Sequence, residues 1–218
     1  MSPEALDEQL VWLCRAAARS IGTTSCGVTM LIRGGQSVTV RSSTPQAQAV
    51  EDLQHTLGEG PGVDATGSGA AVLIPDLTDL TDASLERWPT FARESAGLGV
   101  RAAFAFPLLL GTQPIGAISF YRAAPGGLDA EQVIQGWVTA DAVAQSLVDP
   151  SERLPAASQQ TDPMQVHQAA GMVTVQLGVP IDQALLRMRA TAYAEGQTVD
   201  QLADAIVRRR RRLLKEDT

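Results

Sequence analysis

One polar stretch sets the strongest limit on what this chain can fold into. Residues 149–163 read DPSERLPAASQQTDP, a polar segment that contains three prolines. Such a composition is typical of a linker between folded units. The chain has 218 residues, which is enough for one domain of ordinary size and a small second one. We therefore predict a body over residues 1–149, a linker over 150–161 and a tail over 162–218.

The body shows helical and strand patterns in alternation. Apolar residues recur first at helical spacing and then in β-rich, alternating runs, and glycine or proline separates the segments. The economical arrangement is an α+β fold, in which a central antiparallel sheet is flanked by helices. The predicted elements are a helix over 4–21, a hairpin that turns at Gly34-Gly35, a helix from Thr44-Pro45, a buried strand at 70–76, a helix over 82–96, strands over 100–110 and 114–122 that turn at 111–113, and a helix from Asp129 to about Val148.

The tail predicts an all-α bundle of three helices. A helix-starting residue begins each helix, terminal glycines end the first two, and the Arg run 208–212 is expected to continue the third. A bundle this small buries little surface and gains stability from docking or dimerisation. The boundary signals are Asp162-Pro163 and Gly178, Pro180 and Gly196, and a capping box of Thr198 with Gln201; the inner stripes are Ile181, Ala184, Leu185 and Met188, then Val199, Leu202, Ala203, Ile206 and Val207.

Charge is divided unevenly between the two parts. Up to Gln160 the chain has 9 basic and 17 acidic residues, whereas from Thr161 onward it has 8 basic and 7 acidic ones. An acidic body repels phosphates, while the five consecutive arginines of the tail attract them. This distribution suits a sensor body that carries a small nucleic-acid module, although an arginine run also fits a solvated helix end favoured by the helix dipole.

Several spaced motifs of the tail agree with one known family in the same order. They are Gln168-Ala169-x-Gly171-Met172, Gly178-Val179, Asp182-Gln183-Ala184-Leu185, Arg187-Met188-Arg189-Ala190-x-Ala192 and Leu202-Ala203 with Ile206-Val207. With these motifs the tail resembles the ANTAR family of RNA-binding antitermination domains. The resemblance implies a dimer that binds paired stem-loops in nascent mRNA and prevents a terminator hairpin from forming. Ala170 departs from the family pattern, which often has Lys there.

The candidate RNA contacts combine this resemblance with the chemistry of the side chains. Arg189 and Tyr193 share one helical face, where an arginine can bond phosphate and a tyrosine can stack on an unpaired base. Gly171 lies within a helix at a cost of about 1 kcal/mol, which the close approach of RNA or of another helix would explain. The full set is Gln168, Ala169, Gly171, Met172, Arg187, Arg189, Tyr193, Arg208, Arg209, Arg210, Arg211 and Arg212.

The body carries motifs of a second family. The runs LGEGPGVDA, VLIPDL, RWPTFA, LGVRAAFAFPL and PIGAISFYR make residues 4–148 similar to the GAF domains that precede ANTAR domains in many regulators. Because GAF domains serve many ligands or none, the resemblance implies the fold and leaves the ligand open. It places Arg87, Trp88 and Phe91 beside a ligand pocket, with core packing of Trp88 and Phe91 as the competing interpretation.

No pattern in the chain points to an enzyme. Cys14 and Cys26 lie in apolar patterns that fit buried small hydrophobes, and neither they nor the two histidines have the spacing of a metal site. We expect no cofactor, a cytoplasmic protein without a membrane span, and a homodimer paired through the helices at 4–21 and 130–148. Two alternatives stay open: a GAF-fold enzyme of the methionine sulfoxide reductase type, and a dimeric protein-interaction module that does not bind RNA.

Overall fold

The computed structural model describes residues 3–31, 37–79, 85–148 and 165–213. The predicted Gly34-Gly35 turn, the linker over 150–161 and the start of the tail at Asp162-Pro163 lie outside these ranges. The helices and strands are α1 (Pro3–Ser20), β1 (Ser25–Leu31), β2 (Ser37–Ser42), α2 (Pro45–Leu57), α3 (Pro61–Ser68), β3 (Val72–Ile74), the 3₁₀ turn η1 (Leu85–Arg87), α4 (Pro89–Gly97), β4 (Ala102–Leu110), β5 (Gln113–Arg122), α5 (Ala130–Val148), α6 (Gln165–Leu177), α7 (Ile181–Ala194) and α8 (Val199–Val207).

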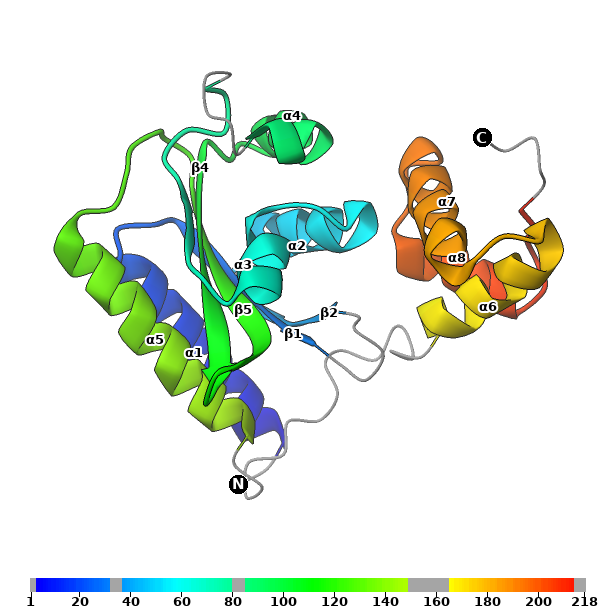
Figure 1. The fold of residues 1–218 in the computed structure, drawn as a ribbon. Coiled ribbons are helices and arrows are strands. Elements are labelled where there is room, and N and C mark those ends of the chain that lie inside the picture. Colours follow the sequence, from blue (N-terminus) through cyan, green and yellow to red (C-terminus); the bar gives the residue numbers. More distant parts are fainter. Residues whose placement is uncertain (1–2, 32–36, 80–84, 149–164, 214–218) are drawn as a thin grey trace.

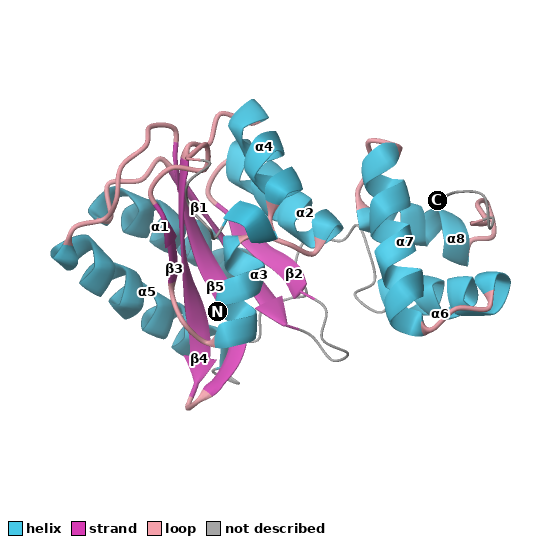
Figure 2. Ribbon diagram, turned by 45° about the horizontal axis from the view of Figure 1, so that its top comes forward, coloured by secondary structure: helices cyan, strands magenta, loops and turns pink. Residues whose placement is uncertain are grey.

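The body has three layers, and a central sheet forms the middle one. Its five strands are all antiparallel to their neighbours and follow the order β2-β1-β5-β4-β3. Helices α1 and α5 cover one face of the sheet, and α2, α3 and α4 cover the other (Figures 1 and 2). The predicted α+β fold with an antiparallel sheet flanked by helices is confirmed.

Alternation along β4 decides what each face of the sheet can hold. Phe104 and Phe106 point into the core beneath α1 and α5, whereas Ala103 and Ala105 face the opposite layer. Successive side chains of a strand point to opposite faces, so large residues fill one side and small ones the other. The alanine face lets α3 approach closely, and its Ala65 packs directly on the sheet.

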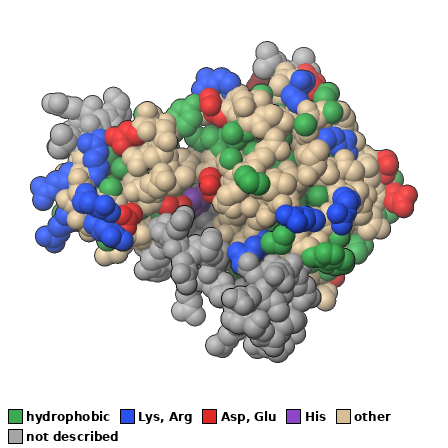
Figure 3. All heavy atoms as spheres, turned by 180° about the vertical axis from the view of Figure 1, so that it is seen from behind, with side chains coloured by type: hydrophobic (Ala, Val, Ile, Leu, Met, Phe, Trp, Pro, Cys, Tyr) green, Lys and Arg blue, Asp and Glu red, His purple; other side chains and the backbone are tan. Residues whose placement is uncertain are grey.

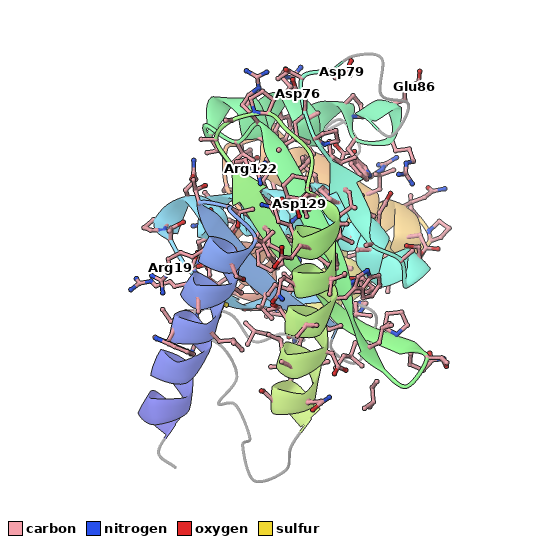
Figure 4. The ribbon with its side chains drawn as sticks, turned by 90° about the vertical axis from the view of Figure 1, so that its left-hand side faces the viewer. Arg19, Asp76, Asp79, Glu86, Arg122 and Asp129 are labelled. Carbon is pink, nitrogen blue, oxygen red and sulfur yellow. The ribbon has the colours of Figure 1, made fainter. Side chains whose placement is uncertain are left out.

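Arg122 at the end of β5 joins the two helices of the first layer. Its Nε donates to the carbonyl of Gly22, just after α1, and its Nη1 donates to the carbonyl of Gly126, in the loop before α5, each at 3.1 Å. Figure 4 shows Arg122 between these elements, close to Asp129. Asp129 accepts from the backbone N–H of Gln132 at 2.8 Å, which confirms the predicted cap of α5.

The tail is the predicted bundle of three helices, α6, α7 and α8, around a core of its own. Gly178 and Gly196 end α6 and α7 in the left-handed conformation, at φ +68° and +65°. Thr198 and Gln201 form the expected capping box at the start of α8. Of the expected apolar stripes, Ile181 is the exception, since it is 45% exposed at the first turn of α7.

Three expectations for the body need correction. Helix α3 is not among the elements that the sequence predicts, since glycine and proline at its start indicate only a separation between segments. The strand at 70–76 is shorter and lies at the sheet edge, where Leu73 is 38% exposed and not buried. The single helix over 82–96 is replaced, within the described residues, by η1 and then by α4, which starts at Pro89 because proline suits the first turn of a helix.

Within the described ranges, no single helix has both the length and the apolar composition needed to cross a membrane. Helices α6 and α7 meet that measure only as a pair, bent by 104°.

Candidate functional site

A pocket in the tail gathers residues from two separate segments. Helix α6 forms one wall, and the end of α8 with the arginines after it forms the other. Its volume is about 510 Å³, within the range of small-molecule pockets. We call it the tail pocket; its lining residues are Gln168, Gly171, Met172, Val175, Gln176, Ile206, Arg209, Arg211 and Arg212.

The second wall exists because α8 ends earlier than expected. Helix α8 stops at Val207, and Arg209 adopts φ +57°, which turns the chain back on itself. The backbone N–H groups of Arg210 and Arg211 both donate to the carbonyl of Ala205, at 2.8 and 3.0 Å. Leu213, 3% exposed, then packs into the core of the tail. The expectation that the arginine run continues the helix is therefore wrong, because this turn and the burial of Leu213 replace further helical bonds.

Gly171 opens the floor of the tail pocket. It lies within α6, and a Cβ atom added there would meet no heavy atom within 4 Å. Close packing of another helix therefore does not explain a glycine at this position. Among the described residues, the space above Gly171 is bordered by the apolar side chains of Met172 and Val175, the latter 84% exposed. The site offers a partly apolar floor on which a flat group can rest.

The arginines of the run differ in what they contact. Arg208 and Arg210 both pair with Asp204, and Arg211 pairs with Glu195 at 2.6 Å. Arg209 and Arg212 have no ion-pair partner among residues 165–213 or elsewhere in the described chain. Figure 3 shows basic side chains gathered over the tail, with acidic ones between them. Two cations at the pocket rim are thus available to an anionic ligand.

The remaining α6 candidates and Arg187 occupy different surroundings. Gln168 is exposed at the pocket, whereas Ala169 is fully buried in the core of the tail. The expected RNA contact of Ala169 therefore needs correction, because its side chain packs between helices and does not reach the surface. Arg187 is half-buried on α7 and does not line the pocket.

Arg189 and Tyr193 lie away from the tail pocket, where α7 meets the body. The Tyr193 hydroxyl accepts from Arg93 Nη2 and donates to Glu94 Oε1, both at 3.0 Å, and these partners belong to α4. The Arg189 guanidinium lies against the backbone of Gly58, at the end of α2, and burial lowers its pKa. The structure does not bring these two candidates together with the other arginines.

The expected ligand-pocket residues of the body lie in and over its core. Trp88 and Phe91 are 1% and 0% exposed, and their rings meet edge to face with centroids 6.4 Å apart. Arg87 is exposed, pairs with Asp64 at 2.7 Å and lies over the Trp88 ring. For Trp88 and Phe91 this burial favours the competing interpretation of core packing, since their side chains fill space between α2, α4 and the sheet.

A buried polar cluster lies where α2 and α3 meet the sheet. Glu51 accepts from the Tyr121 hydroxyl at 2.7 Å and from Gln54 Nε2 at 3.1 Å, and Gln54 also accepts from the backbone N–H of Gly62 at 2.8 Å. Burial raises the pKa of Glu51 to about 7, and the hydrogen bonds from Tyr121 and Gln54 oppose this only in part. We did not anticipate this cluster, although a Glu and a Gln three apart on the inner face of α2 could have indicated it.

The glycine run before α3 is shaped around this cluster. A Cβ atom at Gly60 would lie 2.6 Å from Gln54 Oε1, and one at Gly62 would lie 2.9 Å from Ser119 Oγ. Glu59 in the same run accepts from the backbone N–H of Phe91 at 2.9 Å, near the start of α4. The motif GEGPG therefore positions α3 and α4 against a crowded polar core.

Cys14 and Cys26, the two cysteines of the sequence, are both fully buried, as expected for small hydrophobes. The Cys26 thiol donates to the backbone carbonyl of Cys14 at 3.1 Å, and the neighbouring Cys14 side chain, together with burial, raises the pKa of Cys26. Because the thiolate is the reactive form, Cys26 is a poor nucleophile. The described residues include no group of three or more His, Cys, Asp or Glu that could hold a metal ion.

Comparison with known proteins now adds to this geometry. The model of a family described as GAF domain matches residues 5–148. No ANTAR domain is found in the helices that follow. A search of curated proteins found no match.

Solved structures resemble the body at low sequence identity. A domain of a two-component sensor histidine kinase protein from Sinorhizobium meliloti 1021 is 13% identical, with 65% of this chain and 89% of that one covered and a TM-score of 0.51. The photoproduct state of GAF3 from Synechocystis sp. is 13% identical, with 68% and 99% covered and a TM-score of 0.48. A type II free methionine-R-sulfoxide reductase from Thermoplasma acidophilum is 16% identical, with 66% and 92% covered and a TM-score of 0.43. The first of these likenesses supports the fold of the body and nothing finer.

Proposed function

The chain belongs to the GAF domain family, and from this premise we propose that its body senses a signal while its tail binds RNA stem-loops and promotes transcription antitermination. The observation that carries the proposal is the tail pocket. There Gly171 and a partly apolar floor lie beside Arg209 and Arg212, which have no ion-pair partner in the described part of the chain. An unpaired nucleobase is flat and apolar on its faces, and its phosphate is anionic. The pocket offers an apolar surface for the face of the base and cations for the phosphate.

The position of the pocket favours a loop base over a duplex. A-form RNA hides its base edges in a deep major groove, so proteins read sequence on bases that are splayed from loops. The tail pocket can take one such base beside Gly171, and Arg209 and Arg212 lie at its rim. The resemblance of the tail to ANTAR domains favours the same kind of ligand. We therefore propose hairpins with unpaired loops as the ligand class.

Paired substitutions within the arginine run test this assignment. R209Q/R212Q removes the two rim cations for which the described residues supply no ion-pair partner, whereas R208Q/R210Q removes the same charge from the two arginines that pair with Asp204. We expect the first pair to lower affinity for an RNA hairpin more than the second. It should also flatten the salt dependence, by about 0.7 in the logarithmic slope for each phosphate that is no longer neutralised.

The measurement is fluorescence anisotropy with a synthetic hairpin of randomised loop sequence, repeated over a series of salt concentrations. The same stem without a loop serves as the reference ligand. Equal decreases in affinity for the two double variants would contradict a role for the pocket rim. Binding of the loop-free duplex as tightly as the hairpin would contradict the proposed ligand class.

The buried cysteines oppose the enzyme alternative. A reductase of the methionine sulfoxide type requires a reactive thiol that its substrate can reach. Cys14 and Cys26 are both 0% exposed, and the raised pKa of Cys26 disfavours its thiolate. We therefore propose a regulator without catalytic activity.

An exposed apolar face of α5 supports a homodimer. Ile134 and Val138, one helical turn apart, are 60% and 57% exposed, and Trp12 on the neighbouring α1 is 64% exposed. Large apolar side chains that share a face mark interaction sites. We propose that two copies pair through α1 and α5.

We expect I134E/V138E to be monomeric at micromolar concentrations at which the wild type is a dimer, because charged side chains at the centre of an apolar interface would be desolvated. Light scattering after size exclusion measures the mass. The control is L186E, which places a charge on an equally exposed leucine of the tail. A monomeric wild type throughout this range, with and without RNA, would contradict the dimer.

A further inference from the structure

The tail docks on the body through a polar contact between two pairs of helices. On the body side are the end of α2 and the middle of α4, and on the tail side are α7 and the start of α8 (Figures 1 and 2). Beside the Tyr193 bonds to α4, the backbone N–H of Val199 donates to Thr56 Oγ1 at 3.4 Å. His55 Nε2 lies 3.3 Å from Asp200 Oδ2. The two parts of the chain are therefore held together by specific side chains.

Two of the tail residues in this contact are the same residues that could bind RNA. Tyr193 uses its hydroxyl on Arg93 and Glu94, and Arg189 is covered by the end of α2. Stacking a base on Tyr193 requires its ring to be free, and a phosphate contact requires the Arg189 guanidinium to be uncovered. The body and an RNA molecule therefore cannot both occupy this face of α7 at the same time.

We propose that the body and RNA compete for the Arg189–Tyr193 face of α7, so that docking of the tail lowers its affinity for RNA. This inference rests on the proposed function and adds its regulation. The tail pocket is formed by α6, the end of α8 and the segment after it, and its lining includes none of the α7 and early α8 residues that form the docked contact. RNA therefore meets an available pocket and a covered α7 face in the docked form, and it gains the second surface only on release.

The contact between the tail and the body is polar and partly exposed, as expected of a contact that can open. It is made by hydrogen bonds and charged groups, and the Arg93 and Glu94 side chains are 71% and 40% exposed. Polar contacts between domains resemble transient interfaces more than permanent ones. A ligand that favours either state shifts the equilibrium by its difference in affinity for the two states.

Helix α2 connects this contact with the core of the body. Its inner face carries Glu51 and Gln54, and its last turn carries His55, Thr56 and the Gly58 cap. Gly58 has φ +69°, and any side chain there would collide with the Arg189 guanidinium. If a signal in the body displaced α2, the contact between the Gly58 backbone and the Arg189 guanidinium would therefore change directly.

The test uses the full-length chain with Glu94→Lys, which removes an acceptor of Tyr193 from the exposed surface of α4. Glu131→Lys on α5 makes the same charge change far from the tail, and so controls for general attraction of RNA. The sequence contains two tyrosines. Labelling with 3-fluorotyrosine therefore gives one ¹⁹F signal from Tyr193 and one from Tyr121, which is buried in the body and serves as the internal reference.

We expect E94K to move the Tyr193 signal in the absence of RNA, toward the position that wild type reaches with a saturating RNA hairpin of randomised loop. Its affinity for that hairpin should exceed that of E131K by about threefold or more, since a larger fraction of tails is competent to bind. The Tyr121 signal should stay in place.

Equal affinities of E94K and E131K, with clear RNA binding by both, would overturn the competition alone. An unchanged Tyr193 signal in E94K would also overturn it, because the docked contact would then not depend on Glu94. Absence of RNA binding by wild type and by both variants would overturn the proposed function together with the competition, and the ¹⁹F spectra would still report whether the tail docks.

Discussion

Glu51→Gln is expected to raise the free energy of unfolding at pH 8 by about 3 kcal/mol and to remove most of the pH dependence of stability between pH 5 and 8. The carboxyl of Glu51 is 1% exposed, and burial raises its pKa from 4.5 to about 7. Glutamine has the shape and hydrogen-bonding capacity of the protonated acid. It can therefore occupy the cluster with Tyr121 and Gln54 without ever acquiring a charge.

The sign of the effect follows from which state holds the proton. Between pH 4.5 and about 7 the folded chain keeps a proton on Glu51 that the unfolded chain has released. The contribution of Glu51 to the free energy of unfolding is therefore fully present below the pKa of the unfolded chain. It is lost as the pH rises from that value through the pKa of the folded chain. The neighbouring groups that influence this titration are Tyr121 on β5, Asp52 on α2 and Cys26 on β1.

Urea unfolding of wild type and E51Q at pH 5 and pH 8 measures the effect. Exposed Glu131→Gln is the control, for which the two pH values should give the same difference from wild type. If the pH dependence of E51Q runs parallel to that of wild type, Glu51 does not titrate in this range.

Local signals predicted much of the fold, because they act over a few residues. Thr44 accepts from the backbone N–H of Ala47 at 3.1 Å and caps α2, as its position before Pro45 indicated. The Thr198–Gln201 box likewise forms as its spacing predicted. A cap needs only a side chain and a backbone N–H two or three residues away.

Helix α3 was not predicted because its own sequence carries weak helical signals. Its sequence PGVDATGS is short, contains two glycines and has no apolar stripe. What holds the helix is tertiary contact, since Ala65 packs on Ala105 and Ala117 of the sheet. Propensity is a weak guide where small residues allow such close packing.

Local sequence patterns could not predict the tail pocket, because its two walls come from segments that are distant in the sequence. The sequence predicted Gln168, Gly171 and Met172 as RNA contacts but predicted no pocket, and these three residues line its α6 wall. The second wall depends on Arg209 leaving the helix and Leu213 returning to the core. Arginine is a good helix former, so its propensity favours the helix that the structure does not form.

The second large effect concerns Gly171, where one position should change stability and binding in opposite directions. Gly171→Ala is expected to stabilise the tail by about 1 kcal/mol, since glycine within a helix costs that much relative to alanine and the added methyl meets nothing within 4 Å. Gly171→Leu should keep the tail folded and fill the floor of the pocket. If a base rests there, its exclusion should weaken RNA binding by about 1–3 kcal/mol, a range that extends to roughly a hundredfold.

Gly67 in α3 supplies the matched control for this prediction. It too is helical and has no described heavy atom within 4 Å of an added Cβ, but it lies in the body. G67A and G67L should therefore resemble the Gly171 variants in thermal stability and leave hairpin affinity at the wild-type value. Thermal unfolding by circular dichroism and anisotropy with the hairpin separate the two effects. A G171L variant that folds and binds the hairpin as wild type does would show that RNA, if it binds the tail, does so without entering the pocket.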